Sequence, residues 1–286
     1  MIKRNHLKYT TFNVLLVFIL LITGCNPTIK TNLNLKNNMV THFIDVGQGD
    51  CILIQVNNKN LLIDSGTSDS KEKVIRYLKN NNIKRLDYIV ATHPHDDHIG
   101  GMSRVIDNFE VGEFYAPKIT ATTESFEAMI GSLKNKNHKI KVAKPNFTLD
   151  LGPNTSCTML SPSNLSYKDT NNYSCVIKVS YKNSTYLFAG DAEKLSEQEI
   201  VNRGYDLKAD VLKVAHHGSN SSTSQEFLNK VSPQIAVISC GASNSYGHPN
   251  KETLDKLKKI NCIVYRTDLG KDIILISDGV AITRHH

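Results

Sequence analysis

The sequence predicts a mixed α/β (α+β) protein in which two β-sheets lie between two layers of helices, a four-layer αββα sandwich. Two observations point to this class. Strand patterns joined by short turns alternate with helical patterns throughout residues 39–286, and no internal repeat or linker divides that stretch. The chain has 286 residues, of which 40% are hydrophobic, which is ordinary for a folded core. We therefore expect one large domain over residues 39–286.

The first 24 residues have the pattern of a signal peptide. Lys3, Arg4 and Lys8 give a positive start without any acidic residue, and residues 14–22 form an unbroken apolar run. That run is about half of the roughly 20 residues that a membrane-spanning helix needs. An uncleaved N-terminal membrane anchor is the alternative interpretation.

The segment that follows the apolar run, residues 21–25 (Leu-Ile-Thr-Gly-Cys), resembles the lipobox of bacterial lipoproteins. The resemblance implies that Cys25 carries the lipid and becomes the mature N-terminus. Residues 25–38, rich in Asn, Thr and Lys, would then be a flexible tether. We expect a protein on the outer face of the bacterial cytoplasmic membrane, held by the lipid anchor alone and without a spanning helix.

Charge and cysteine content restrict the function only loosely. The net charge is +7, which becomes +4 when the three basic residues of the signal peptide are removed. This excess suits a polyanionic partner such as nucleic acid or teichoic acid, although a solvated basic surface explains it equally well. The five cysteines other than Cys25 have irregular spacings and no CxxC pair, so most are expected to be buried small residues, with a disulfide as the alternative.

The remaining elements follow from hydrophobic periodicity and turn residues. Strands are predicted over residues 39–46, 51–56, 61–64, 86–91, 155–160, 174–180, 184–189, 210–215, 234–239, 262–266 and 271–277. Helices are predicted over residues 71–81, 99–108, 123–134, 194–203, 223–230 and 251–259.

A dense group of metal-ligand residue types follows the strand predicted over 86–91. His93, His95, Asp97 and His98 lie within six residues, and neutral imidazole and carboxylate are preferred ligands of zinc and similar cations. On a tightly turning segment the first two residues can grip one ion and the last two a second. Gly100 and the glycine after it let the backbone pass close to such a site.

Two metals need more ligands than this run supplies, and three later strands end in suitable residues. The strand over 184–189 ends at Asp191, the strand over 210–215 leads into His216 and His217, and the strand over 234–239 precedes His248. Adjacent residues on a strand face opposite ways, so we expect only one of the paired histidines to bind a given ion. Loops at strand ends converge, which favours a single site.

The order of these motifs resembles that of the metallo-β-lactamase superfamily, and within it the branch that contains the extracellular domain of the competence protein ComEC. The resemblance covers residues 39–284. Its marks are DVGQGD at 45–50, LIDSG at 62–66, THPHDDHIGG at 92–101, Gly-Asp at 190–191 and HHGS at 216–219. The HxHxDH run is specific for the superfamily, while the first and last marks together indicate the branch, here as a standalone lipoprotein. The resemblance implies an αββα sandwich with the metals at one edge of both sheets.

The resemblance also implies a role for each matching residue. His93 and His95 would bind the first metal, Asp97 and His98 the second, and Asp191 would bridge the two. His217 is favoured to complete the second site. His216 would then face the substrate, where it can stabilise charge or shuttle a proton. Asp64 would support the histidine loop from behind, with a plain turn residue as the alternative.

One departure from the superfamily is visible. Most members have a further histidine of the first metal site between the HxHxDH run and the bridging aspartate, but the corresponding stretch here, residues 170–174 (Thr-Asn-Asn-Tyr-Ser), has none. The ComEC-like branch shares this absence. Water, a substrate oxygen or a longer reach from His248 would have to fill the gap. We therefore expect the His93/His95 part to be the open part, where the substrate meets the metals.

The expected activity is hydrolysis with two divalent cations, zinc or alternatively manganese. Such a pair holds a bridging water, lowers its pKa and aims it at a phosphorus or carbonyl centre. Asp97, His216 and His248 are the expected catalytic residues. The branch favours a phosphodiester substrate, either DNA, with a link to DNA uptake, or a wall polymer of the teichoic-acid type. The alternatives are β-lactam or lactone hydrolysis and a non-catalytic module that binds DNA or metal.

Overall fold

The structure is a computed structural model that describes residues 35–164 and 166–285. The predicted signal peptide, Cys25 and most of the predicted tether lie outside the described residues, so these assignments stay predictions. Within the described residues, no helix is both long enough and apolar enough to cross a membrane.

The first sheet has eight strands in the order β14-β13-β1-β2-β3-β4-β5-β6. Strands β13, β1, β2 and β3 pair antiparallel, whereas β3, β4, β5 and β6 run parallel. The strands are β1 Met39–Phe43, β2 Ile52–Val56, β3 Lys59–Ile63, β4 Arg85–Val90, β5 Glu110–Ala116, β6 Ile140–Val142, β13 Ile273–Ser277 and β14 Ile282–His285.

The second sheet has six strands in the order β12-β11-β10-β9-β8-β7. Its strands β9 to β12 are parallel, and β7 and β8 pair antiparallel at the other side. The strands are β7 Thr155–Met159, β8 Ile177–Tyr181, β9 Ser184–Phe188, β10 Val211–Lys213, β11 Ile235–Ile238 and β12 Ile263–Arg266.

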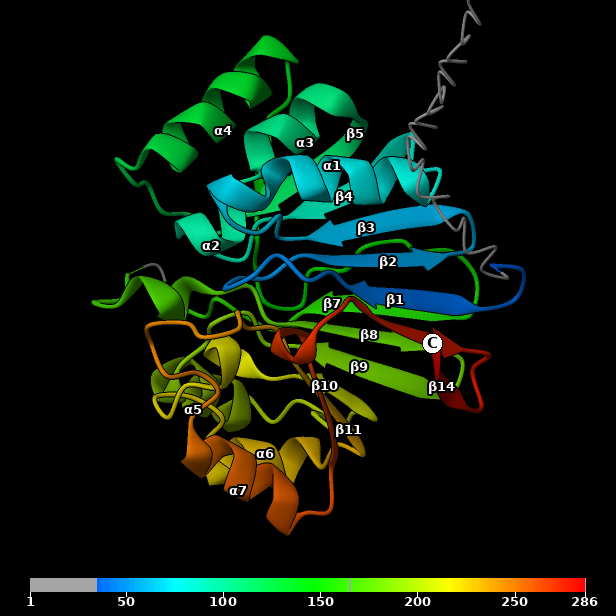
Figure 1. The fold of residues 1–286 in the computed structure, drawn as a ribbon, viewed down its shortest axis with the longest axis vertical. Coiled ribbons are helices and arrows are strands. Elements are labelled where there is room, and N and C mark those ends of the chain that lie inside the picture. The colour runs from blue at the N-terminus through cyan, green and yellow to red at the C-terminus, as the bar shows by residue number, and fades with distance from the viewer. Residues whose placement is uncertain (1–34, 165, 286) are drawn as a thin grey trace, which may run out of the picture. The chain divides into compact units, whose positions relative to one another are not determined.

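Helices cover the outer face of each sheet, as Figure 1 shows. The helices on the first sheet are α1 Lys71–Asn80, α2 Asp96–Ile99, α3 Met102–Asn108 and α4 Glu124–Asn135. Those on the second sheet are α5 Lys194–Asn202, α6 Gln225–Val231 and α7 Lys251–Lys259. Short 3₁₀ helices complete the chain: η1 Ser68–Ser70, η2 Thr170–Tyr173, η3 Ala215–Gly218 and η4 Thr267–Leu269.

Three apolar clusters hold these four layers together. One lies between the sheets and joins residues such as Phe43 and Leu61 of the first sheet to Ile177 and Phe188 of the second. A second cluster joins α1, α3 and α4 to the first sheet, and a third joins α5, α6 and α7 to the second. Each sheet buries both faces, which explains why its central strands are continuous apolar runs in the sequence.

The predicted αββα sandwich is confirmed, with three strands missing from the prediction. Strands β5, β6 and β14 were not expected, because β5 contains Gly112 and two glutamates, β6 has only three residues and β14 is a polar edge strand. The helix expected over 99–108 is two helices, α2 and α3. The cysteines are free within the described residues. Cys51, Cys157, Cys175 and Cys240 are buried, whereas Cys262 is only half-buried.

The topology brings the predicted site residues to one edge. The carboxyl end of β4 leads to His93, that of β9 to Asp191 and that of β10 to His217. Strand β4 belongs to the first sheet and the other two strands to the second. The site is therefore assembled from both sheets at their shared end.

Candidate metal centre

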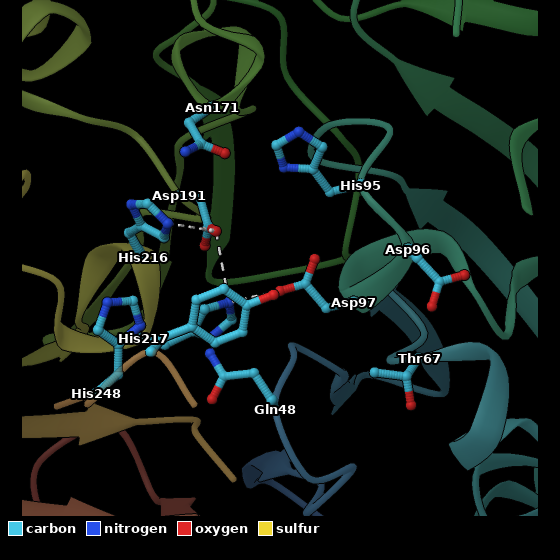
Figure 2. A pocket seen from close by; sticks show the side chains of 11 residues that line it. Gln48, Thr67, His95, Asp96, Asp97, Asn171, Asp191, His216, His217 and His248 are labelled. Atoms are coloured by element: carbon cyan, nitrogen blue, oxygen red, sulfur yellow. Dashed lines mark hydrogen bonds and ion pairs between the residues drawn. The ribbon is translucent and has the colours of Figure 1, made fainter. Parts of the chain in front are cut away.

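Four side chains converge at this edge. Asp97, His98, Asp191 and His217 each offer one ligand atom, and these four atoms all lie within 4.8 Å of one another. His217 Nε2 is 3.1 Å from Asp97 Oδ2 and 3.4 Å from Asp191 Oδ2. His98 Nε2 is 3.2 Å from Asp191 Oδ2. We call this group the closed half of the centre, and Figure 2 shows its pocket side.

The far ring nitrogen of each histidine in the closed half is held from behind. His98 Nδ1 donates to Asp64 Oδ2 at 2.7 Å, and His217 Nδ1 donates to the carbonyl oxygen of Ser239 at 2.8 Å. A proton on Nδ1 leaves a lone pair on Nε2, the atom that faces the other ligands. Backing of this kind fixes the tautomer and ring orientation of metal-binding histidines.

Asp64 is the centre of this support. It is fully buried in a left-handed backbone conformation (φ 59°) directly after β3. Besides His98, its carboxylate accepts the Thr92 backbone N–H and the Thr92 hydroxyl, both at 2.7 Å. The structure thus places Asp64 behind the histidine loop, with its carboxylate bonded to Thr92, which precedes the HxHxDH run, and to His98, which ends it.

A buried ion pair supports His217 from the other side. Lys213 Nζ lies 2.7 Å from Asp50 Oδ2, and both side chains are at most 1% exposed. The other oxygen of Asp50 is 3.6 Å from His217 Nδ1. The preceding turn approaches the site closely, because a Cβ added at Gly49 would lie 2.3 Å from the carbonyl oxygen of Asp97. Asp50 therefore has a defined place beside the centre, and sequence reasoning did not identify its partner Lys213.

The charges of the closed half depend strongly on one another. Burial disfavours the charged form of His217, but the nearby carboxylates, above all Asp191, outweigh this effect and raise its pKa to about 10. Burial alone would lower the pKa of His98, but the nearby carboxylates, above all Asp191, outweigh burial and raise it well above its usual value. Burial alone would raise the pKa of Asp191, but His217 and His98 outweigh burial and hold it well below its usual value. The buried carboxylate of Asp191 and the partly exposed one of Asp97 therefore need positive charge beside them.

A divalent cation fits this arrangement. His98 Nε2 and Asp191 Oδ1 are fully buried, yet within the described residues neither makes a hydrogen bond. Unpaired buried polar atoms are costly, and two carboxylates facing two imidazole lone pairs form a donor set typical of zinc and related ions. The geometry and the chemistry of the closed half therefore both match a metal-binding site.

His93 and His95 form the other half of the centre, which we call the open half. His93 Nε2 and His95 Nδ1 lie 3.0 Å apart, so both rings present a nitrogen to one point. His93 is buried, whereas His95 is half-buried and lines the pocket. Burial, followed by the neighbouring His98, holds the pKa of His93 well below its usual value, so His93 is neutral and available as a ligand.

The stretch that lacks the expected histidine still delivers polar side chains to the centre. Ser174, fully buried, has its hydroxyl 3.3 Å from His93 Nδ1 and accepts the Asp191 backbone N–H at 3.0 Å. Asn171 lines the same pocket as His95 and Asp191, and Figure 2 places it beside them. Its Oδ1 is buried without a hydrogen-bond partner in the described part of the chain. Apart from their place in the stretch that lacks the expected histidine, no sequence pattern pointed to either residue.

The two adjacent histidines take up an unusual backbone conformation. They were expected to continue the preceding strand, but β10 ends at Lys213 and both histidines belong to η3. His216 (φ 49°) and His217 (φ 53°) are both left-handed, a region that costs about 1–3 kcal/mol for a non-glycine residue. The turn sends His217 into the closed half and His216 towards the pocket, so the expected division between them follows from this turn and not from strand alternation.

The pocket outside the metal ligands has a volume of about 510 Å³. His216 lines it, with Nε2 at 3.8 Å from Asp191 Oδ2, Nδ1 at 3.1 Å from the Ser221 hydroxyl and 3.4 Å from Glu193 Oε1. His248 lies against His216, their ring centres being 5.5 Å apart. Figure 2 shows His248 on the His216 side of the pocket and His95 on the opposite side, so His248 is not placed to complete the open half.

Comparison with known proteins identifies the class. The profile of the family described as the metallo-beta-lactamase superfamily matches residues 44–242. The fold is similar to that of the metallo-beta-lactamase fold protein YhfI from Bacillus subtilis, with a TM-score of 0.56 at 14% identity over 85% of this chain and 100% of that one. It is also similar to Igni18, a metallo hydrolase from Ignicoccus hospitalis, with a TM-score of 0.54 at 16% identity over 82% and 98% of the two chains. The chain belongs to the metallo-β-lactamase superfamily.

Sequence relatives narrow the position within the family. The chain is 32% identical to ComE operon protein 3 of Bacillus subtilis over 79% of this chain and 31% of that protein. It is 32% identical to the competence protein ComA of Neisseria gonorrhoeae over 82% of this chain and 32% of that protein. The chain thus spans about a third of the length of these relatives. The superfamily resemblance is confirmed, and the relatives are consistent with the ComEC-like branch. The fold is that of a metallo-hydrolase, and its candidate ligands imply divalent metals.

Proposed function

We propose that this protein is an extracytoplasmic metal-dependent phosphodiesterase that acts on DNA or on a phosphodiester polymer of the cell surface. The observation that carries the proposal is the convergence of Asp97, His98, Asp191 and His217, with the histidine nitrogens directed inward and backed from behind. This donor set has the chemistry of a hydrolytic metal centre and opens on a pocket large enough for a substrate.

The residues of the two halves divide the task of holding the ions. Asp97, His98 and His217 would hold one cation, His93 and His95 the other, and Asp191 is the carboxylate proposed to touch both. Bound divalent cations supply Lewis acidity to a phosphoryl group and lower the pKa of a bound water. Zinc suits the imidazole-rich donor set, with manganese as the alternative.

The pocket residues supply what the metal ligands do not. His216 is 22% exposed and faces both the pocket and a carboxylate, Glu193, so it can take up a proton at one ring nitrogen and present it to a departing oxygen. His248 is half-buried beside it and lines the same pocket, so its ring can contact the substrate there. Asp97, at the pocket edge of the closed half, orients the attacking water in this proposal.

Two further observations favour a phosphodiester substrate and a location outside the membrane. One relative is named as a competence protein and another as a ComE operon protein, and the chain carries a net positive charge, which suits a polyanion. The predicted signal peptide and lipobox favour an outer, lipid-anchored position. Incorporation of labelled palmitate that disappears in Cys25→Ala supports this location, and equal labelling of both chains contradicts it.

The substrate class is tested by one panel of assays. The purified protein, loaded with zinc or manganese, is given bis-p-nitrophenyl phosphate, single-stranded DNA, p-nitrophenyl phosphorylcholine and nitrocefin. The proposal expects turnover of the phosphodiesters. Hydrolysis of nitrocefin alone contradicts it in favour of a β-lactamase, and two bound metals without any turnover contradict it in favour of a binding module.

A further inference from the structure

A second hollow lies beside the metal centre and has no part in the site described above. Its volume is about 990 Å³, and it is formed by the segments that follow β5, β6 and β7 together with Tyr173 and Arg203. Four of the side chains that line it are basic: Lys118, Lys141, Lys144 and Arg203. None of the described lining residues is acidic. We call this hollow the basic groove.

Sheet topology fixes the position of the basic groove relative to the metals. Strands β4, β5 and β6 are parallel neighbours, so their carboxyl ends lie side by side at one edge. The end of β4 leads to His93, the end of β5 to Lys118 and the end of β6 to Lys144. With neighbouring strands about 4.8 Å apart, two strand spacings separate β6 from the strand of the open half, roughly 10 Å.

The 3₁₀ helix η2 gives a second link between the two hollows. Its Asn171 lines the pocket of the metal centre, and Tyr173, two residues later, lines the basic groove. A chain-like ligand that lies in the groove can therefore reach the open half by passing over a single turn of backbone.

The positive charge of the basic groove is only partly neutralised. Lys141 pairs with Glu113 at 2.5 Å, but Lys118 and Lys144 are exposed and make no ion pair with any described carboxylate. Arg203 donates to the neutral hydroxyl of Ser163 at 2.9 Å, which leaves its charge uncompensated by a described residue. Three free cations along one hollow favour a polyanionic ligand.

The basic groove also offers an apolar surface. Phe147 is 37% exposed, an unusual exposure for a phenylalanine, and its ring rests on Tyr115 with centres 5.2 Å apart. Pro145 and Pro162 line the hollow beside it. An exposed aromatic ring held in place from below, next to cations, is the combination by which proteins bind unpaired nucleotide bases.

We propose that the basic groove binds single-stranded nucleic acid, with Lys118, Lys144 and Arg203 on the phosphates and Phe147 stacked on a base, and leads the strand to the open half. The inference rests on the proposed phosphodiesterase function. A duplex hides the faces of its bases, and a wall polymer of glycerol phosphate has no bases, so neither uses the ring of Phe147.

Binding is measured by fluorescence anisotropy with a labelled 20-nucleotide oligo-dT and the full chain in detergent, in EDTA to prevent cleavage. The double variant Lys118→Ala/Lys144→Ala loses two phosphate contacts, so the slope of log affinity against log salt falls by about 1.4. The affinity at 0.1 M salt then falls roughly 25-fold. Phe147→Ala weakens binding about 5-fold or more at an unchanged salt slope, and Phe147→Tyr restores it.

The matched control is Lys258→Ala/Lys259→Ala on α7, which removes the same charge from exposed positions outside the groove. Its affinity stays within about twofold of the unchanged protein because screening limits long-range effects. Equal losses in both double variants overturn the inference. It is also overturned if duplex DNA or poly(glycerol phosphate) binds as tightly as oligo-dT and Phe147→Ala has no effect.

Hydrolysis of bis-p-nitrophenyl phosphate separates this inference from the function on which it rests. That substrate is too small to need the groove, so the groove variants keep its turnover. If the protein hydrolyses the small ester but the groove variants bind oligo-dT as tightly as the unchanged protein, the inference about the basic groove is overturned and the proposed function is not. Loss of oligo-dT binding in the groove variants, in a protein that hydrolyses no phosphodiester, supports the groove and overturns the proposed function.

Discussion

The two halves of the metal centre lie side by side but differ in how completely the protein builds them. In the closed half, each histidine is locked by an acceptor behind it, and two carboxylates share the space with two imidazoles. In the open half, His93 and His95 face each other, and the hydroxyl of Ser174, between η2 and β8, lies beside His93. The difference indicates that one metal is held by the fold and the other is left accessible to what enters the pocket.

The largest effect is expected from Asp191→Asn, which strikes the residue proposed to join the halves. Loss of its charge leaves His98 and His217 without the carboxylate that they share, so metal content falls and kcat/KM drops by roughly 1,000-fold. Metals per chain are counted by plasma mass spectrometry, and turnover is followed with bis-p-nitrophenyl phosphate. Asp96→Asn is the matched control, because that carboxylate bonds Ser68 instead of the centre. A variant that keeps two metals would contradict the bridging assignment.

Proton competition should separate the halves by their response to pH. The raised pKa of His217, about 10, means that a proton must leave before a metal binds in the closed half at neutral pH. Metal affinity there should rise about tenfold per pH unit for each proton released, which is roughly 100-fold between pH 6 and 8 for the His217 proton alone and more if His98, whose pKa is also raised, releases a proton. The lowered pKa of His93 means that no proton on this residue competes with a metal in the open half. Zinc titrations against a chelating dye at several pH values measure both sites, and equal slopes would remove the distinction.

His216→Ala tests a residue that faces the pocket without belonging to either half. Both metals should remain bound, while kcat falls about 100-fold, because the variant removes the proposed proton donor and leaves the ligands intact. Metal content and kcat are compared in the same preparation. Ser221→Ala provides the control for the hydrogen bond that orients His216, with a smaller loss expected. Loss of a metal together with activity would instead assign His216 as a ligand.

Asn171→His should produce the smallest of these effects, and it is the variant expected to increase metal affinity. It places an imidazole where the superfamily usually has one, in a position that already lines the pocket next to His95. Imidazole is a better zinc ligand than an amide, so affinity in the open half should increase about tenfold while the closed half is unaffected. The zinc titration against a chelating dye measures the affinity of the open half directly. Asn172→His is the control, since Asn172 instead accepts the backbone N–H of Ser196, and equal effects of both would argue against the role of position 171.

The two-sheet fold and most of the residues that meet at its edge could be predicted from the sequence, because both depend on local patterns. The apolar runs identify the buried strands, and the HxHxDH spacing is legible without tertiary structure. The pairing of Lys213 with Asp50 was beyond reach, since the two lie far apart in the sequence and only the packing of the sheets joins them. The same holds for Asn171, an ordinary polar residue until the fold buries its side-chain oxygen at the pocket. Strand β5 was missed because its burial comes from neighbours and not from its own pattern.

The pairing of β1 with β13 has a consequence for the time at which the protein can fold. Met39 lies opposite Ser277, so a central strand of the first sheet must wait for residues near the end of the chain. Pairings over such separations slow folding, because the intervening chain must be ordered first. For a polypeptide with the proposed export signal, such a delay would keep the chain unfolded until its last strands have emerged, so that the proposed metal centre would be assembled only after export.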